Sequence, residues 1–318
     1  MTKPDLLVIY PLAEPALEAL ARTTNMHRVF DAPDPAAVIA KAAGAVRGVA
    51  ASYEKAVDKA FIDSLPKLEI IAGFGVGYDY IDVGYAAKKG IMVTNTPDVL
   101  TEEVADLTLG LMLATVRELP QADRYLREGR WLKGDYPLTA SLRGRRIGIL
   151  GLGRIGKAIA RRCEAFGLTI AYHGRHRQRD VDYPYYDTLV GLARDVDMLV
   201  VVAPGGTGTK HLVNRAVLEA LGRDGSLINV ARGSVVDEAA LIAALKNKTI
   251  RAAGLDVFAD EPNVPAELIA MDNVVLLPHV GSASVKTRTE MGQLVADNLI
   301  AWFAGKEPLT PVPETARR

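Results

Sequence analysis

The segment from residue 146 to residue 166 constrains the fold more than any other part of the chain. It opens with the apolar run 146–150 (RIGIL), passes directly into 151–156 (GLGRIG) and continues as a helical pattern. Glycines at these positions permit a tight turn, close approach of a pyrophosphate and close packing of helix against strand. The N-terminus of the following helix offers N–H groups and a positive dipole to phosphate. The segment therefore predicts a dinucleotide-binding unit within a parallel α/β sheet.

The rest of the chain repeats this alternation of strand and helix. Short β-rich runs alternate with helical periods, a pattern typical of parallel sheets with crossover helices. Because 318 residues exceed one comfortable core, we expect two such halves. The first half is predicted to contain strands at 6–10, 28–30, 46–51, 68–72 and 91–94, with helices such as 55–65 and 83–89. The second half is predicted to contain strands at 146–150, 169–172, 198–202, 226–229, 252–255 and 274–277.

Two helical segments stand apart from this alternation. A long helical stretch covers 102–129 and is interrupted near Pro120. A final helix is predicted from about Ser284, a suitable N-cap, to the residue before Gly305. The proline-rich tail that follows, residues 308–318, is expected to lie over the surface or to be mobile.

Composition excludes several classes of function. Lys and Arg total 38, as do Asp and Glu, so no net field attracts nucleic acid or an anionic membrane. No apolar run approaches the length of a membrane span, and the first residues lack a signal-peptide pattern. The single cysteine, Cys163, excludes an internal disulfide framework and fits a packed helix position in a reducing compartment. No His, Cys or carboxylate spacing predicts a metal site. We expect a soluble cytoplasmic protein.

A basic stretch follows the second strand of the glycine-rich half. Its members are His173, Gly174, Arg175, His176 and Arg177. At this distance from the glycine loop, a carboxylate would hold the ribose 2′-hydroxyl of NAD. Guanidinium groups instead make bidentate contacts with phosphate, and a glycine lets the backbone approach. The alternative is a solvated loop balanced by Asp180 and Asp182. The placement of the basic stretch at the adenosine end favours a binding site for the 2′-phosphate of NADP(H), with NADH as a weaker cofactor.

Further motifs, taken together, resemble one known family. They are 75–79 (GVGYD), 229–234 (NVARGS), 254–258 (GLDVF), 260–262 (DEP) and 278–282 (PHVGS). With GLGRIG, their order and spacing resemble the D-isomer-specific 2-hydroxyacid dehydrogenase family over essentially the whole chain. The basic stretch brings the chain closest to the NADP-dependent glyoxylate/hydroxypyruvate reductases of that family. The resemblance implies NADPH-dependent reduction of small 2-oxo acids to D-2-hydroxy acids.

This resemblance implies a specific domain organisation. The family combines a Rossmann dinucleotide-binding domain with a flavodoxin-like substrate domain, and its active site lies in the cleft between these two doubly wound domains. Residues 1–98 and 288–318 would form a discontinuous substrate domain, and residues 99–287 the dinucleotide-binding domain. In the family, the helical stretch after Thr101 embraces a second subunit, so a homodimer is expected.

Reduction of a 2-oxo acid needs a cation for the carboxylate, a donor at the carbonyl oxygen and a proton donor. The resemblance implies that Arg232 supplies the first two and that His279 supplies the proton. Glu261 would pair with His279 and favour its imidazolium. Asp256 would tune this pair or support the nicotinamide side.

The resemblance also implies a set of binding contacts. Substrate contacts would be Ser52, Val76, Gly77, Arg232 and His279, with the backbone N–H groups near Val76 holding the carboxylate. Cofactor contacts, besides the basic stretch, would be Val76, Thr101, Gly151, Leu152, Gly153, Arg154, Ile155, Gly156, Ala203, Pro204, Thr209, Val230, Ala231, Arg232, Asp256, His279 and Gly281. Ser52 and Tyr53 are compatible with a hydroxyl-bearing substrate, without selecting one acid.

Several alternatives remain at this stage. A branch that oxidises formate carries Gln at the position of Glu261, which argues against that reaction. Phosphoglycerate dehydrogenases often add a C-terminal regulatory domain that this sequence lacks. An NAD(H)-sensing transcriptional corepressor keeps the same catalytic trio, but the basic stretch disfavours it. Keto-sugar acids and phenylpyruvate stay open as substrates.

The other histidines and the tryptophans lack such motif context. We expect His27 and His211 to be structural and Trp131 and Trp302 to be packing residues. Trp131 could also reach the cleft of a neighbouring subunit.

Overall fold

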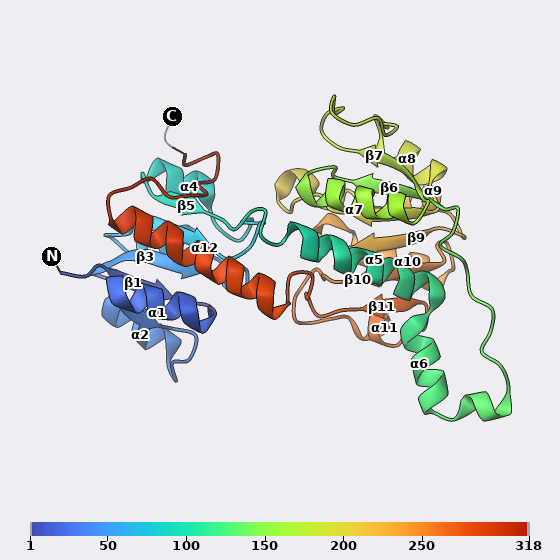
Figure 1. The fold of residues 1–318 in the computed structure, drawn as a ribbon, viewed down its shortest axis with the longest axis horizontal. Coiled ribbons are helices and arrows are strands. Elements are labelled where there is room, and N and C mark those ends of the chain that lie inside the picture. The colour runs from blue at the N-terminus through green and yellow to red at the C-terminus, as the bar shows by residue number, and fades with distance from the viewer. Residues whose placement is uncertain (1, 317–318) are drawn as a thin grey trace. The chain divides into compact units, whose positions relative to one another are not determined.

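The chain forms two compact α/β units, drawn in Figure 1. This computed structural model describes residues 2–316; the expectations for Met1 and for the last two arginines lie outside the described residues. One unit comprises Met1–Leu100 and Ala283–Arg318, and the other comprises Thr101–Ser282. Each unit contains one parallel sheet, which confirms the predicted fold class. None of the described helices is long and apolar enough to span a membrane.

The first unit is built on a five-stranded sheet with the order β2-β1-β3-β4-β5. Its strands are β1 (Asp5–Val8), β2 (Asn25–Arg28), β3 (Val46–Ala51), β4 (Ile70–Gly73) and β5 (Met92–Thr94). One face carries α1 (Glu14–Thr23) and α12 (Val285–Phe303); the other carries α2 (Pro35–Ala42), α3 (Lys59–Asp63) and α4 (Val83–Lys88). A Cβ on Gly48 would lie 2.8 Å from the Phe303 ring, so α12 packs directly on β3. The return of α12 makes this unit discontinuous in sequence.

The second unit is built on a six-stranded sheet with the order β11-β10-β9-β8-β6-β7. Its strands are β6 (Arg146–Leu150), β7 (Thr169–His173), β8 (Met198–Val201), β9 (Ser226–Asn229), β10 (Ala252–Leu255) and β11 (Val274–Leu276). Helices α5 (Thr101–Arg117) and α7 (Arg154–Ala165) cover one face; α8 (Leu189–Asp195), α9 (Arg215–Leu221) and α10 (Glu238–Lys246) cover the other. Strands buried on both faces explain the nearly continuous apolar runs in the sequence.

The strand order of the second unit points to a binding edge. Ligands of open parallel sheets bind beyond the carboxyl ends of the strands, where the strand order reverses. Here the reversal lies at β6, which is flanked by β7 and β8. Gly151 follows β6 at this edge, and a Cβ on it would lie 2.8 Å from the Ala203 nitrogen. The loops after these two neighbouring strands therefore touch at the expected binding edge.

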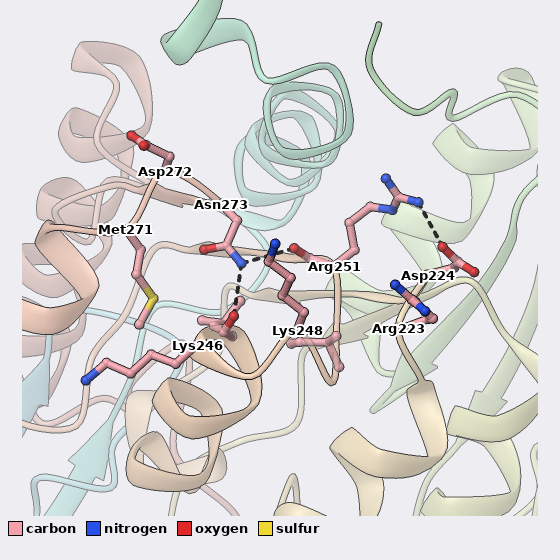
Figure 2. Close-up of a pocket in the computed structure, with 10 residues that line it drawn as sticks. Arg223, Asp224, Lys246, Lys248, Arg251, Met271, Asp272 and Asn273 are labelled. Carbon is pink, nitrogen blue, oxygen red and sulfur yellow. Dashed lines mark hydrogen bonds and ion pairs between the residues drawn. The ribbon is translucent and has the colours of Figure 1, made fainter. Parts of the chain in front are cut away.

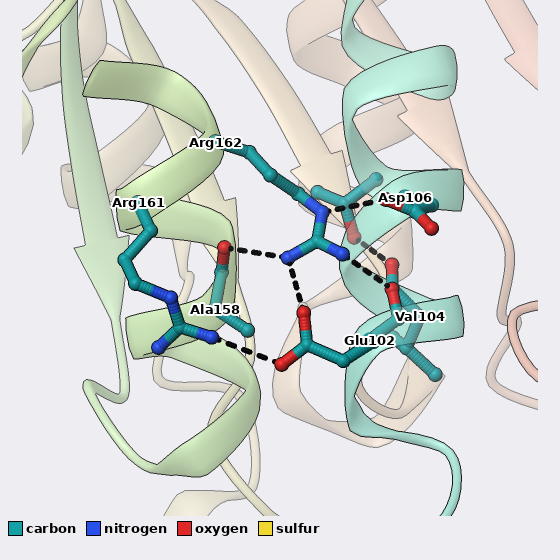
Figure 3. Close-up of polar contacts among 7 residues, drawn as sticks. Glu102, Val104, Asp106, Ala158, Arg161 and Arg162 are labelled. Atoms are coloured by element: carbon teal, nitrogen blue, oxygen red, sulfur yellow. Dashed lines mark hydrogen bonds and ion pairs between the residues drawn. The ribbon is translucent and has the colours of Figure 1, made fainter. Parts of the chain in front are cut away.

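An ion-pair network ties α5 to α7, as Figure 3 shows. The Arg162 guanidinium contacts the carboxylates of Glu102 at 2.7 Å and Asp106 at 2.6 Å. It also donates to the Glu102 backbone carbonyl at 3.2 Å, while Arg161 takes the other Glu102 oxygen at 2.9 Å. Arg162 is only 22% exposed, so this contact is less screened than an ordinary surface pair. The network anchors the first turn of α5 on the helix that follows the glycine loop.

The predicted strands all exist, but some boundaries shift. The ranges predicted for β3, β6, β9 and β10 match the structure. The second strand begins earlier than predicted because the Asp5 carboxylate accepts from Asn25 at 2.6 Å and contacts the His27 ring at 2.7 Å. The helix predicted at 55–65 starts later because the Asp58 side chain caps it, accepting from the Phe61 N–H. The break near Pro120 falls at Glu118, whose backbone is left-handed (φ 51°).

The tail lies along the surface of the first unit, as one of its two expectations had it, whereas the packing expectation for Trp131 is wrong. The described part of the tail is anchored, because the Val312 N–H donates to the Val93 carbonyl at 2.9 Å and Val312 is buried. The Thr310 hydroxyl adds a bond to the Asn95 carbonyl. Trp131 is 64% exposed and does not pack in its own chain, whereas the Trp302 indole donates to Glu69. Tertiary partners that the local sequence does not reveal, Val93 and Asn95, anchor the tail.

Candidate active site

The glycine loop fits a dinucleotide on evidence from its own geometry. Gly151 has φ +99°, and a Cβ on Gly156 would lie 2.4 Å from the Gly151 carbonyl oxygen, so backbone packing requires both glycines. Gly153 is different: its backbone is extended, and a Cβ there would meet no atom within 4 Å. The protein itself gives no steric reason for this third glycine. A pyrophosphate seated on the first turn of α7 would supply one, because it needs the backbone uncovered.

The basic stretch presents three exposed cationic or titratable side chains. Among residues 2–316, Arg175, His176 and Arg177 make no hydrogen bond or ion pair. Asp180, one of the two carboxylates that would balance a solvated loop, pairs instead with Lys157 at 2.6 Å. This hydrogen bond holds the pKa of Asp180 below its ordinary value. Two arginines without a protein carboxylate at the adenosine end of the loop favour an external anion over a self-neutralised surface loop.

His279 and Glu261 form a close hydrogen-bonded pair. The imidazole Nδ1 lies 2.6 Å from Glu261 Oε2, and both side chains are about four-fifths buried, at 20% and 21% exposure. The other carboxylate oxygen accepts the Phe258 N–H at 2.9 Å. Burial alone would raise the pKa of Glu261, but the hydrogen bond and charge of His279, with Phe258 and Arg232, hold it below the ordinary value. An ionised carboxylate therefore orients the imidazole, with Nε2 on the opposite edge of the ring.

Asp256 holds the turn that carries His279. Its carboxylate accepts the N–H groups of Val280 at 2.7 Å and Gly281 at 2.8 Å, and its carbonyl accepts the His279 N–H at 2.9 Å. His279 has φ 53°, a left-handed conformation that non-glycine residues rarely adopt. Burial raises the pKa of Asp256, while these N–H groups and the His279 charge oppose the rise. The geometry thus shows that Asp256 supports the turn that carries His279; a direct cofactor contact stays a proposal.

Arg232 follows β9 on a tightly constrained turn. The Asn229 side chain accepts from the Ala231 N–H at 3.1 Å and donates to the Arg232 carbonyl at 3.0 Å. A Cβ on Gly233 would lie 1.9 Å from the Phe258 carbonyl carbon, so the two loops are in backbone contact there. Sequence reasoning quoted both motifs but missed these two positioning residues, Asn229 and Gly233. Their contacts bring the Arg232 turn beside the segment that carries Glu261.

The loops after β8 and β9 contain further predicted contacts. Ala203, Pro204, Val230 and Ala231 follow β8 and β9 at the carboxyl edge of the sheet, the edge at which Arg232 and His279 also lie. The Thr209 hydroxyl donates to the Pro204 carbonyl at 2.6 Å and closes the first of these loops. The second unit therefore gathers the glycine loop, the basic stretch and the trio along one edge of its sheet.

The first unit contains a separate turn with free donors. The Gly75 N–H donates to the Thr96 hydroxyl, the Thr96 N–H donates to the Gly75 carbonyl, and the Asn95 amide donates to the Val76 carbonyl, each at 2.9 Å. Within the described chain, the N–H groups of Val76 and Gly77 have no acceptor. Two adjacent free N–H groups suit a carboxylate. Ser52, just after β3, is buried, and its hydroxyl has no hydrogen-bond partner in the described residues.

A surface pocket on the second unit, shown in Figure 2, lies away from these residues. Its volume is about 590 Å³, and it contains none of the predicted site residues. Its charged lining is Arg223, Asp224, Lys246, Lys248, Arg251 and Asp272. These residues precede β9, β10 and β11, at the amino edge of the sheet. Cations here face the carboxyl ends of the helices, which they stabilise, and Arg251 already pairs with Asp224 at 2.8 Å. This pocket therefore lies at the opposite edge of the sheet from the glycine loop and His279.

Comparisons with known proteins identify the family. Residues 109–281 match the model of the D-isomer specific 2-hydroxyacid dehydrogenase NAD binding domain. The chain is 47% identical to glyoxylate/hydroxypyruvate reductase A of Arabidopsis thaliana over 306 residues, covering 96% of this chain and 98% of the relative. It is 40% identical to the 2-ketogluconate reductase of Gluconobacter oxydans, with 98% and 99% coverage.

A solved structure also matches the whole chain in sequence and in fold. The NADPH-dependent glyoxylate/hydroxypyruvate reductase of Sinorhizobium meliloti, in complex with NADP and malonate, is 54% identical to this chain. The TM-score is 0.93, and the match covers 100% of this chain and 99% of that one.

A parallel sheet with a dinucleotide loop and a histidine–carboxylate pair at one edge defines a nicotinamide-dependent oxidoreductase. Within that class, the chain belongs to the D-isomer-specific 2-hydroxyacid dehydrogenase family, as its motifs predicted.

Proposed function

We propose that the protein reduces glyoxylate and hydroxypyruvate to D-2-hydroxy acids with NADPH. The observation that carries this proposal is the His279–Glu261 pair beside the Arg232 turn, on the same sheet edge as a glycine loop that fits a dinucleotide. The reductases of Arabidopsis thaliana and Sinorhizobium meliloti support the choice of substrate and cofactor. Bound NADPH would supply the hydride, and residues of the chain would bind the substrate, polarise its ketone and deliver the proton.

Each member of the trio has a separate task in this proposal. The Arg232 guanidinium binds the substrate carboxylate and polarises the ketone oxygen. His279 delivers a proton from Nε2 to that oxygen as negative charge develops on it. Glu261 holds Nδ1 and favours the charged imidazole that a proton donor must be. The free N–H groups of Val76 and Gly77, together with Ser52, are proposed substrate contacts in the first unit.

The substrate assignment is tested by steady-state kinetics with NADPH and a panel of 2-oxo acids. The panel contains glyoxylate, hydroxypyruvate, 2-ketogluconate and phenylpyruvate. We expect the highest kcat/KM with glyoxylate or hydroxypyruvate. A clear preference for 2-ketogluconate would favour the activity of the Gluconobacter oxydans relative. Turnover of none of them would favour an NAD(H)-sensing binding protein instead.

Cofactor selection gives a second prediction. Replacing Arg175 by alanine should raise KM for NADPH by about 10- to 100-fold, the value of one hydrogen bond to a charged group. KM for NADH should stay nearly constant, because NADH has no 2′-phosphate. The measurement is kcat/KM for both cofactors at low and high salt, since screening should weaken the preference of the wild type.

A matched variant separates local recognition from general charge. Arg179 is an exposed cation that follows the basic stretch, so Arg179→Ala removes the same charge. It should leave the cofactor preference largely intact. If wild type uses both cofactors equally, residues 173–177 are a solvated charged loop and the NADPH proposal fails.

Glu261 gives a pH prediction. Its lowered pKa means that the carboxylate is ionised through neutral pH and is lost only as pH falls through that lowered value. In Glu261→Gln the amide cannot ionise, so this position carries no negative charge at any pH. The loss of activity that follows protonation of Glu261 on the acidic side should therefore be absent from the variant, whose kcat/KM should be low across the whole pH range.

The measurement is kcat/KM for glyoxylate from acidic to alkaline pH. Glu238→Gln is a matched control, because the Glu238 carboxylate accepts the Ala259 N–H at 3.1 Å but has no hydrogen bond with His279. Its profile should follow the wild type. Wild-type kcat/KM with an unchanged acidic limb in Glu261→Gln would contradict the proposed pair.

We also propose a homodimer and a cytoplasmic location. The segment from α6 (Leu119–Arg127) through η1 (Arg130–Lys133) to Leu138 exposes several large apolar side chains, which monomers rarely do. Trp131 is 64% exposed, and Leu132 is 94% exposed. Light scattering on the full chain tests the dimer, and a monomer at micromolar concentration would contradict it. The single buried cysteine supports a reducing compartment.

A further inference from the structure

The basic stretch is anchored at both of its ends. At the start, the Tyr185 hydroxyl donates to the Gly174 carbonyl at 3.2 Å. At the end, the Gln178 N–H donates to the Tyr172 hydroxyl oxygen at 2.7 Å. Tyr172 is 1% exposed and packs against the Tyr185 ring, so both anchors belong to the core. We call residues 174–178 the cationic loop.

The Gln178 side chain makes a second, longer-range contact. Its amide Nε2 donates to the Leu152 backbone carbonyl, within the glycine loop. Leu152 is 2% exposed and belongs to the hydrophobic core of the second unit, so the acceptor lies on a packed segment. The residue that precedes the cationic loop, His173, is also tied to the glycine loop, because the Gly151 N–H donates to the His173 carbonyl at 2.9 Å. The turn proposed for the pyrophosphate and the loop proposed for the 2′-phosphate are therefore joined at two points.

This geometry leaves three side chains between two fixed ends. Arg175, His176 and Arg177 make no hydrogen bond or ion pair in the part of the chain that the structure describes. A loop with free ends would lose conformational entropy when it closed on a phosphate, whereas an anchored loop has already lost most of it. In a dinucleotide, the pyrophosphate and the ribose 2′-position are held at a limited separation by covalent bonds. A contact that sets the same separation in the protein favours a ligand bearing both phosphates.

We propose that Gln178 is a positioning residue for cofactor selection. Its bond to Leu152 holds the cationic loop at the distance from the glycine loop at which Arg175 and Arg177 meet a 2′-phosphate. This inference rests on the proposed NADPH preference. It adds that selection depends on an uncharged residue that touches neither phosphate. The effect of Gln178 is confined to ligands with a 2′-phosphate, because the glycine loop is kept in place by Gly151 and Gly156.

The experiment compares binding of two small probes to the full chain by calorimetry. Adenosine 2′,5′-bisphosphate carries both phosphates, and adenosine 5′-monophosphate lacks the 2′-phosphate. The variant Gln178→Met keeps the length of the side chain and removes the donor. The Kd for the bisphosphate should rise about 3- to 10-fold, the value of one uncharged hydrogen bond. The Kd for the monophosphate should stay within about twofold.

A matched variant and a double-mutant cycle sharpen the test. Gln121 also donates its amide to backbone carbonyls, those of Asp272 and Val274, so Gln121→Met makes the same chemical change elsewhere. It should keep the wild-type ratio of the two Kd values. In an Arg175→Ala, Arg177→Ala background, Gln178→Met should cause no further loss of bisphosphate affinity, because the groups that it positions are gone.

The possible outcomes are distinguishable. A wild type that binds both probes equally contradicts the 2′-phosphate site itself, and this inference with it. If wild type is selective but Gln178→Met weakens both probes alike, Gln178 only supports the fold. Selective binding that Gln178→Met leaves unchanged shows that the loop needs no such anchor. The thermal midpoint of each variant is measured alongside, so that unfolding is not mistaken for loss of affinity.

Discussion

Replacing His279 by alanine is expected to lower kcat for 2-oxo acid reduction by about 10²–10⁴-fold, the usual contribution of a positioned general acid. The imidazole is held in one orientation, because Glu261 binds its Nδ1 and the Asp256 carbonyl accepts the His279 backbone N–H. The Kd for NADPH should change little, because the glycine and cationic loops are untouched. Single-turnover kinetics and cofactor titration measure the two effects separately.

The left-handed backbone at His279 calls for a second variant. At φ 53° an alanine is strained, so His279→Ala alters the turn as well as the chemistry. Asparagine tolerates this conformation better but does not supply a proton as an imidazolium does. His279→Asn should therefore lose activity to a similar degree while retaining more stability. Substantial activity in the asparagine variant would show that the backbone, and not proton donation, explains the effect of alanine.

Most of the fold could be predicted from the sequence because its strands are buried on both faces. Such strands appear as short apolar runs, and four of the predicted ranges match the structure. The glycine loop could be predicted for a different reason: two of its three glycines are required by backbone contacts, and the third by the proposed ligand. The chemical trio came from family motifs, because no periodicity places Arg232, Glu261 and His279 together.

Tertiary contacts of individual side chains could not be predicted from the sequence. Asp256 was placed near the pair, but only the structure shows both carboxylate oxygens on the turn that carries His279. Gln178 reads as one more polar residue after a charged run, and its partner, Leu152, lies 26 positions away. Gly233 has an ordinary backbone, so its necessity comes from a loop that follows another strand. Contacts between loops that follow different strands are invisible to local patterns.

Arg232 should have an effect of comparable size, divided between binding and chemistry. A guanidinium that binds the substrate carboxylate stabilises the ground state and the transition state alike, and its loss raises KM. The same group also faces the charge that develops on the ketone oxygen, and its loss lowers kcat. Arg232→Ala is expected to raise KM for glyoxylate about 10- to 100-fold and to lower kcat about 10²–10³-fold.

Arg232→Lys separates charge from geometry. Lysine keeps the positive charge but loses the planar fork that binds a carboxylate through two parallel hydrogen bonds. It should recover part of kcat while KM stays high.

The charge of Arg232 also helps to lower the pKa of Glu261. In Arg232→Ala that pKa should rise, so the acidic limb of the pH profile moves to higher pH, whereas Arg232→Lys should keep it near its wild-type position. Kinetics across the pH range measure both effects at once. Wild-type KM and kcat in Arg232→Ala would show that a different cation binds the 2-oxo acid.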